Sequence, residues 1–275
     1  MAGFSYMLAP IEDMTSNAFR TICFRHGADL TFTEMVRFNS LARNNKTTWE
    51  RIKLNDSTPT AIQLIGHREI FLKKFLSKFS PAEGFAGFDL NLGCPAPNFV
   101  NNGMGCAMIK RIAKTKALVG IIKKAGYTIS IKLRLGLNQF EKDKKVYLNL
   151  INAADADFFV VHARHGMQTY AEPADFSVYE DCVKTGKEII ANGDINTKEQ
   201  VDSLKKIGVK GVMIGRAAVA EPTIFNRLKG IQTLSLNKVL SDYLILVERF
   251  GEPFRYRKNI QKHIGQNPLF NAPNL

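Results

Sequence analysis

The stretch that decides the fold, residues 188–216, reads EIIANGDINTKEQVDSLKKIGVKGVMIGR. Its two short apolar runs, Glu188–Asn192 and Gly211–Ile214, have the length and composition of buried strands. Between them, apolar residues recur at helical spacing over Thr197–Ile207. Thr197 suits an N-cap, and Gly208 stands where a left-handed residue commonly ends a helix. The stretch therefore predicts a strand–helix–strand unit with parallel strands.

The same alternation continues along most of the chain. Predicted strands cover Ser5–Ala9, Ala28–Thr33, Thr60–Ile65, Gly87–Leu92, Thr128–Leu133, Asp157–His162, Glu188–Asn192 and Gly211–Ile214. Predicted helices include Ser16–Arg25, Arg68–Phe79, Thr115–Lys124, Lys142–Ala153 and Thr197–Ile207. Eight strand–helix units predict an α/β fold, the (β/α)8 TIM barrel, because eight parallel strands close a barrel. A doubly wound open sheet is the alternative, but no GxGxxG motif follows the first strand.

We expect a barrel over residues 1–230 and a short C-terminal helical appendage over residues 231–275. The appendage shows no strand pattern, and Lys238–Phe250 has the spacing of an amphipathic helix. A basic cluster follows, made of Arg255, Arg257, Lys258, Lys262 and His263. Residues 265–275, GQNPLFNAPNL, are rich in turn-forming residues, and we expect part of them to be disordered.

Composition narrows the class of protein. The 275 residues are 45% hydrophobic, and no apolar run reaches the ~18 residues of a membrane span. The opening MAGFSYMLAP lacks the basic and apolar regions of a secretory signal. The cysteines show no CxxC pairing and the histidines no HxxEH or HxH spacing, so we expect neither a disulfide framework nor a metal site. These features predict a cytoplasmic protein without a membrane segment.

The chain is strongly basic, with 38 Lys and Arg against 25 Asp and Glu and a net charge of +13. Such an excess attracts polyanions, and nucleic acid is the commonest of these in the cytoplasm. Charge alone favours a nucleic-acid partner slightly over a general solubility trait.

Polar or otherwise unusual residues end nearly every predicted strand. In strand order they are Pro10, Glu34, Gln63, Asn91, Lys132 with Arg134, His162, Asn192 to Asp194, and Gly215 with Arg216. The carboxyl ends of barrel strands share one mouth, where the loops of (β/α)8 enzymes form the active site. Each residue alone also has a structural reading, but together they predict one functional site at this rim.

Within this rim, Asn91-Leu92-Gly93-Cys94-Pro95 places a thiol on a constrained turn. Gly93 tolerates unusual backbone angles, and Pro95 restricts the chain after Cys94. A thiol in such a place acts as a nucleophile, a metal ligand or a proton donor. A buried structural cysteine, the commonest use of this residue, fits a Gly-Cys-Pro turn poorly.

Cationic residues mark the other strand ends. Because side chains alternate along a strand, Lys132 and Arg134 point to the same side. Burial of two positive charges there costs free energy unless an anionic cofactor or substrate binds beside them. The glycines after the last two strands, with Arg216 beside Gly215, resemble the phosphate-binding corner common in this fold. The sequence thus predicts a phosphorylated ligand.

Together these motifs resemble those of the tRNA-dihydrouridine synthases, which are flavin enzymes with a TIM barrel. The most specific match is residues 89–95, DLNLGCP, to the family's DLNxGCP. Further matches are Leu8-Ala9-Pro10 with Phe19-Arg20 (APMxGxTDxxFR), residues 33–36 (SEMV), 63–66 (QLxG), 103–107 (GxGGA), 132–136 (KxRxG), 161–164 (VHxR), 192–195 and 213–217. The resemblance covers the chain from Leu8 to Lys229.

The resemblance implies an FMN-dependent enzyme that uses NADPH or NADH to reduce uridine in tRNA to dihydrouridine. It implies hydride transfer from flavin N5 to C6 of an extruded uracil, with Cys94 protonating C5. The residues implied for FMN are Pro10, Gln63, Lys132, His162, Asn192, Gly193, Asp194, Gly215 and Arg216, and those for the base are Asn91, Arg134 and Arg164. The basic cluster would grip tRNA phosphates, and we expect a monomer.

The chain departs from the family pattern at Ile11-Glu12-Asp13, at Ser16 and at His165, and its C-terminal region looks short for the family. Three other functions stay open. They are a flavin enzyme for a small pyrimidine, similar to dihydroorotate dehydrogenase, a Schiff-base aldolase that uses Lys132, and an inactive RNA-binding module. The VHxR segment and the positive charge favour tRNA as the substrate.

Overall fold

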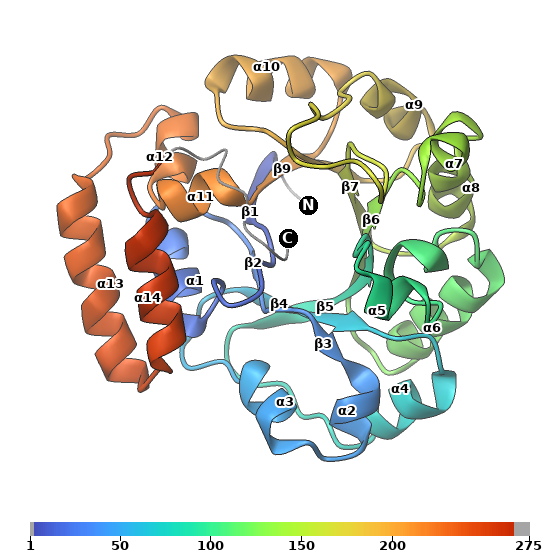
Figure 1. Ribbon diagram of the computed structural model, residues 1–275, viewed down its shortest axis with the longest axis horizontal. Helices are drawn as coiled ribbons and strands as arrows, with labels where there is room; N and C mark the ends of the chain where they lie inside the picture. Colours follow the sequence, from blue (N-terminus) through green and yellow to red (C-terminus); the bar gives the residue numbers. More distant parts are fainter. Residues whose placement is uncertain (1–2, 267–275) are drawn as a thin grey trace.

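Parallel strands form the barrel predicted from the sequence, and the open-sheet alternative is excluded (Figure 1). The computed structural model describes residues 3–266. Strand order is β1-β9-β8-β7-β6-β5-β4-β2, with the short β3 also paired to β4. Leu8 N donates to Leu30 O (2.9 Å) and Asp29 N to Tyr6 O (2.7 Å), which completes the ring between β1 and β2. The strands are β1 Ser5–Leu8, β2 Thr31–Phe32, β3 Val36–Arg37, β4 Thr60–Ile65, β5 Phe85–Leu92, β6 Ile129–Arg134, β7 Phe158–His162, β8 Ile189–Asn192 and β9 Gly211–Ile214.

Helices surround the barrel on its outside (Figure 1). They are α1 Asn17–Arg25, α2 Phe38–Ala42, α3 Lys46–Arg51, α4 Glu69–Leu76, α5 Pro97–Val100, the 3-10 helix η1 Gly105–Met108, α6 Ile112–Lys124, α7 Gln139–Asp143, α8 Val146–Ala153, α9 Val178–Lys184, α10 Lys198–Ile207, α11 Arg216–Ala220, α12 Ile224–Lys229, α13 Leu236–Phe250 and α14 Phe254–His263. Within residues 3–266, none of them has the length and apolarity needed to cross a lipid bilayer.

Capping explains the helix ends that the sequence predicted. Thr197 and Gln200 form a reciprocal capping box at the start of α10, which satisfies backbone N–H groups that a helix leaves free. Gly208 ends α10 in the left-handed region, with φ of 101°. Ser16 accepts a hydrogen bond from Phe19 N at the start of α1.

Two elements differ from the prediction. Lys145 interrupts the expected helix Lys142–Ala153 and separates α7 from α8, because its backbone is left-handed with φ of 50°. The spacing of apolar residues, on which the prediction rested, gives no sign of such a backbone conformation. The expected strand Ala28–Thr33 shortens to β2, because the carboxylate of Asp29 accepts the Tyr6 N–H (2.7 Å) in place of a backbone carbonyl.

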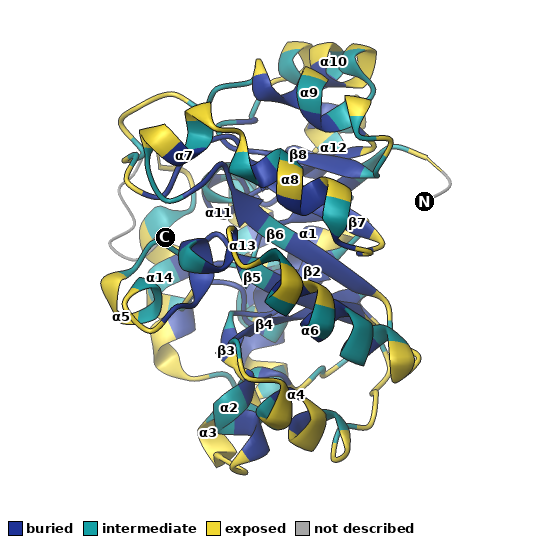
Figure 2. Cartoon of the chain, turned by 90° about the vertical axis from the view of Figure 1, so that its right-hand side faces the viewer, coloured by how far each residue is buried: buried dark blue, intermediate teal, exposed yellow. Residues whose placement is uncertain are grey.

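The core has two layers, separated by the strands, which are buried almost throughout (Figure 2). A small cluster fills the barrel interior: Met7, Ala9, Phe32, Ala61, Phe158, Val160, Ile190 and Met213. A much larger cluster lies between the strands and the surrounding helices. The interior cluster closes the barrel below the mouth, as is typical of this fold, so a ligand site must lie above it.

The C-terminal helices pack against the side of the barrel that carries α1 (Figure 1). Phe19 in α1 meets Tyr243 in α13 edge to face, with ring centroids 6.3 Å apart. Tyr256 in α14 donates a buried hydrogen bond to Glu34 (2.6 Å). The two-region division of the chain stays a prediction, and the disorder expected over residues 265–275 falls mostly on residues 267–275, outside the described residues.

Candidate functional site

A cavity of about 720 Å³ opens at the carboxyl ends of the strands. Its lining includes every residue that the family resemblance assigned to FMN, to the base or to catalysis: Pro10, Gln63, Asn91, Cys94, Lys132, Arg134, His162, Arg164, Asn192, Gly193, Asp194, Gly215 and Arg216. Glu34, which the strand-end pattern placed at the same rim, is not part of this lining and instead binds Tyr256 and the Asp13 N–H. The volume lies in the range of small-molecule and cofactor pockets. The structure therefore brings these residues together, although the individual roles assigned to them stay predictions.

Cys94 is held in place by a hydrogen-bond chain that begins in the barrel interior. Buried Asp89 accepts hydrogen bonds from Ser130 Oγ (2.6 Å) and from Gln63 Nε2 (2.7 Å). Gln63 Oε1 in turn accepts from Asn91 Nδ2 (3.0 Å), and Asn91 Oδ1 accepts from the backbone N–H of Cys94 (2.9 Å). Because its oxygen and one amide hydrogen are used inside the protein, Asn91 has one N–H left for a ligand.

The Cys94 thiol is partly exposed, whereas the other three cysteines are buried. Burial of most of its side chain raises the pKa of Cys94 above its usual value, and this outweighs the opposing effects of an Ala96 backbone hydrogen bond and of Arg134. The sulfur is therefore protonated at neutral pH. Such a thiol suits proton donation better than nucleophilic attack, which needs the thiolate.

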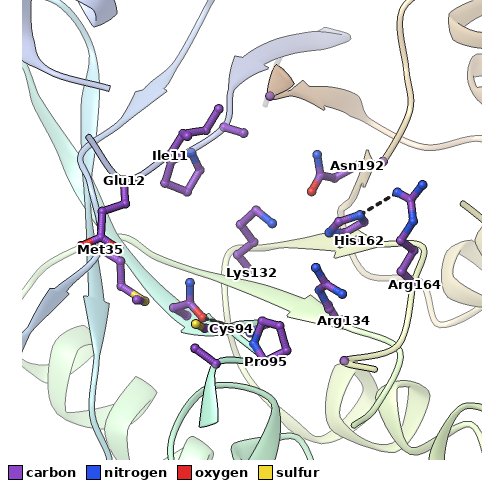
Figure 3. Close-up of a pocket in the computed structure, with 18 of the residues that line it drawn as sticks. Ile11, Glu12, Met35, Cys94, Pro95, Lys132, Arg134, His162, Arg164 and Asn192 are labelled. Atoms are coloured by element: carbon purple, nitrogen blue, oxygen red, sulfur yellow. Dashed lines mark hydrogen bonds between the residues drawn. The ribbon is translucent and has the colours of Figure 1, made fainter. Parts of the chain in front are cut away.

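Lys132 extends into the middle of the cavity, between Cys94 and the wall that carries His162 (Figure 3). Burial, followed by the positive charge of Arg134, lowers the pKa of Lys132 to about 8, and Asp89 opposes this shift. Arg134 is fixed in position because its Nη1 donates a hydrogen bond to the carbonyl of His165 (2.9 Å). Lys132 is thus a partly buried cation whose charge depends on a nearby anion.

His162 is neutral and its tautomer follows from its neighbour. Burial, then the charges of Arg134 and Lys132, lower the pKa of His162 well below its usual value. Arg164 Nη1 donates to His162 Nε2 (3.2 Å), so the ring proton is on Nδ1 (Figure 3). Arg164 also binds Asp194 and the Glu172 carbonyl (2.6 Å). With these partners, Arg164 orients His162 and Asp194.

One corner of the cavity has the features of a phosphate site. Arg216 Nη2 binds Asp194 Oδ1 (2.9 Å), whereas Arg216 Nη1 is buried and has no hydrogen-bond partner in the described part of the chain. A smaller cavity of about 50 Å³ adjoins this corner, lined by residues 192–196 and 213–217. Gly193 has φ of 116°, and a Cβ there would lie 3.0 Å from His162 Cδ2, so glycine keeps the corner open. An anion with several oxygens would satisfy the unpaired guanidinium N–H.

Sequence reasoning missed Tyr170, which lines the same cavity. Its ring stacks on His162 with centroids 6.1 Å apart, and the guanidinium carbon of Arg216 lies 4.2 Å from the ring centroid. Arg134 and Arg164 also approach this ring, at 5.7 and 5.5 Å. Tyr170 belongs to an irregular segment after β7, where no periodic pattern marks a residue as buried or functional.

The segment that departs from the family pattern, residues 11–13, is held by α14. Asp13 adopts a left-handed backbone with φ of 56°, and its N–H donates to Glu34, which also accepts from Tyr256. Asn259 Nδ2 donates to the Asp13 carbonyl (3.1 Å), and Arg255 pairs with the Asp13 carboxylate (3.0 Å). The C-terminal region therefore supports one wall of the cavity, where Ile11 and Glu12 lie.

Comparison with known proteins identifies the family. The sequence profile of "Dihydrouridine synthase (Dus)" matches residues 7–264. The chain belongs to the dihydrouridine synthase family. The family resemblance predicted from the sequence motifs is thereby confirmed.

Individual relatives support the same family. The chain is 31% identical to a probable tRNA-dihydrouridine synthase of Helicobacter pylori over 93% of this chain and 81% of that protein. It is 27% identical to a probable tRNA-dihydrouridine synthase of Rhizobium leguminosarum over 94% of this chain and 83% of that protein. A solved structure of DHODH from Eimeria tenella with ferulenol shares the fold at 13% identity and a TM-score of 0.56, covering 95% and 84% of the two chains.

Removing the Asn91 amide tests whether it positions the thiol. We expect Asn91→Ala to free the Gly93 and Cys94 N–H groups (3.1 and 2.9 Å from Asn91 Oδ1) and to loosen the turn. Alkylation of Cys94 by iodoacetamide, followed by peptide mass spectrometry, should then become several-fold faster. Buried Cys182 is the internal control and should stay unreactive. An unchanged Cys94 rate contradicts the positioning role of Asn91.

Proposed function

We propose that this chain is an FMN-dependent tRNA-dihydrouridine synthase that reduces a uridine of tRNA with electrons from NADPH or NADH. The carrying observation is one cavity lined both by Arg216, whose buried Nη1 has no hydrogen-bond partner among the described residues 3–266, and by the protonated thiol of Cys94. Membership of the dihydrouridine synthase family supports the enzyme class and the substrate.

The residues present fit FMN. The corner of Gly193, Gly215 and Arg216 would take the phosphate, and Asp194 would hold Arg216 in place from the protein side. Pro10, Gln63, Lys132 and His162 line the wider part of the cavity and would contact the flavin ring, with Asn192 beside them. Gln63 retains one amide hydrogen, and neutral His162 offers its Nδ1–H, so both have a donor for ring oxygens or nitrogens.

Pro10, Gln63, Lys132 and His162 would hold the flavin ring, and FMN bound there would, once reduced, be the source of the hydride for C6 of the uracil. Cys94 then donates its proton to C5, which completes the saturation of the C5–C6 bond, and solvent returns a proton to the sulfur. Asn91 keeps the thiol on its turn and directs its remaining N–H toward the base. Positive charge on Lys132 and Arg134 favours the negative charge that develops on the uracil as hydride arrives.

A uracil stacked inside folded RNA cannot enter this cavity, so the nucleotide must be extruded. The net charge of +13 supplies general attraction for the phosphate backbone. Within α14, Arg255 and Arg257 are engaged with Asp13 and Glu248, which leaves Lys258 and Lys262 as the freer cations of the basic cluster. We propose tRNA as the partner of a cytoplasmic monomer.

The other functions considered from the sequence receive less support. The structural likeness to DHODH shows the barrel fold alone at 13% identity, so it does not favour a small pyrimidine over tRNA. A Schiff-base aldolase would use the lowered pKa of Lys132, yet it leaves Cys94 and the phosphate corner without a role. An inactive RNA-binding module leaves the whole cavity unexplained.

Replacing the acid tests the function directly. We expect Cys94→Ala to retain flavin and its reduction by NADPH, but to lose dihydrouridine formation by roughly 10²-fold or more, the usual contribution of a positioned acid. Dihydrouridine in tRNA is measured by mass spectrometry of nucleosides. Cys182→Ala, which alters a buried cysteine in α9, is the matched control and should stay active. Full turnover by Cys94→Ala rules out the acid assignment.

Lys132 makes flavin binding dependent on pH. Its pKa of about 8 is raised when an anionic ligand enters, so the attraction is fully present below pH 8 and is lost as the pH rises above it. We expect FMN affinity for the apoprotein to fall between pH 7 and pH 9.5, with proton uptake on binding at pH 9 in calorimetric titrations. Lys132→Met should remove both effects. Equal FMN affinity of the wild-type protein at both pH values contradicts this role.

A further inference from the structure

A second group of cations lies outside the cavity, on the rim of the mouth beside β4 and β5. His67 and Arg68 follow the carboxyl end of β4, and Arg111 and Lys114 stand at the start of α6, after the loop that carries Cys94. Helices α4 and α6 pack side by side, on the far side of the barrel from α14 (Figure 1). We call these four residues the basic rim.

The basic rim has no partner of opposite charge within residues 3–266. None of Arg68, Arg111 and Lys114 forms an ion pair there, although exposed Glu69 is the next residue in sequence after Arg68. Burial lowers the pKa of His67, and the charges of Lys114, Arg111 and Arg68 lower it further. All three cations therefore lie near this imidazole. In α14, by contrast, Arg255 and Arg257 each pair with a carboxylate.

His67 also carries an unsatisfied atom. Its Nδ1 is shielded from solvent and has no hydrogen-bond partner among residues 3–266. A protein normally leaves few such atoms, because each costs free energy unless a ligand, an ion or water satisfies it. A phosphate near this neutral imidazole would be attracted by the three cations, and its oxygens could accept hydrogen bonds from them and from His67 in its Nδ1–H tautomer.

The guanidinium groups of this surface are arranged by packing. Arg68 lies over the Phe71 ring, 4.9 Å from its centroid, and Arg43 approaches the same ring at 5.3 Å. Arg111 rests on Gly103, where an added Cβ would lie only 2.8 Å from its Nη1. Arginines held in this way lose less conformational entropy when they bind an anion than freely rotating side chains do.

We propose that the basic rim binds the sugar–phosphate backbone of the RNA beside the extruded uridine. This inference rests on the proposed function, because the loop between the basic rim and the cavity carries Cys94 at one end and Arg111 at the other. A strand that delivers its base to Cys94 and passes over this loop brings neighbouring phosphates to His67, Arg68, Arg111 and Lys114. The basic rim binds the RNA strand on the side of the barrel mouth opposite α14.

The test compares two triple variants of the flavin-loaded protein. R68A/R111A/K114A removes three charges from the basic rim. K124A/K206A/K210A removes three exposed lysines that form no ion pair within residues 3–266 and that lie near the amino ends of the strands, on the opposite face. Binding of a fluorescently labelled tRNA transcript is measured between 50 and 200 mM salt, where each lost phosphate contact lowers the slope of log K against log salt by about 0.7–0.9.

We expect R68A/R111A/K114A to bind tRNA roughly 10-fold or more weakly at ~100 mM salt, with a slope smaller by about 2 to 3. Its KM for tRNA should rise in the same proportion while kcat and the flavin spectrum stay as in the wild type. The control variant should keep the wild-type slope. His67→Leu, which removes the unsatisfied nitrogen without a change of charge, should weaken binding with no change in slope.

The outcomes separate the inference from the proposed function. Equal tRNA affinity and slope for the two triple variants of an active enzyme overturns the basic rim as an RNA site. A wild-type protein that binds tRNA through the basic rim but forms no dihydrouridine contradicts the proposed function alone.

Discussion

The account depends on one electrostatic constraint, which is the complete or partial burial of four cationic side chains around a single cavity. Lys132, Arg134, Arg164 and Arg216 all line it, with Glu12 and Asp194 as the carboxylates of its wall. Removal of these charges from water is costly, and the protein compensates only in part. Asp194 binds two of the arginines, yet Arg216 Nη1 has no hydrogen-bond partner within the residues that the structure describes, and the pKa of Lys132 is lowered to about 8. A phosphorylated ligand, as in the proposed binding of FMN, would supply the missing negative charge.

Burial also determines the protonation states of Cys94 and His162. It raises the pKa of Cys94 and lowers that of His162, so that the thiol and the imidazole are both uncharged at neutral pH. For Cys94, burial outweighs the nearby cations, whose charge favours the thiolate. The cavity therefore offers a proton donor, a neutral ring donor and fixed positive charge within one water-restricted space. That combination suits a reaction in which an uncharged substrate receives hydride and proton in turn.

Much of this arrangement was predictable from the sequence, since barrel periodicity places the strand ends at one mouth. The residues from Pro10 to Arg216 that were assigned to the site do share one cavity. What the sequence did not predict depends on irregular segments or on pairing across the chain. Tyr170 lies among arginines because the loop after β7 turns back over the mouth, and Arg164 binds Asp194 from thirty positions away. Likewise, the ion pairs that engage Arg255 and Arg257 are tertiary contacts, and a count of basic residues cannot reveal them.

The central claim is that buried positive charge at Arg216 anchors the cofactor by its phosphate. The most direct test is calorimetric titration of the apoprotein with FMN and with riboflavin, which differ only in that phosphate, for the wild type and for Arg216→Met. We expect the wild type to prefer FMN by roughly 10²-fold, the effect of two charged hydrogen bonds, and Arg216→Met to lose most of this preference. Equal affinity of the wild-type apoprotein for FMN and riboflavin would contradict the account.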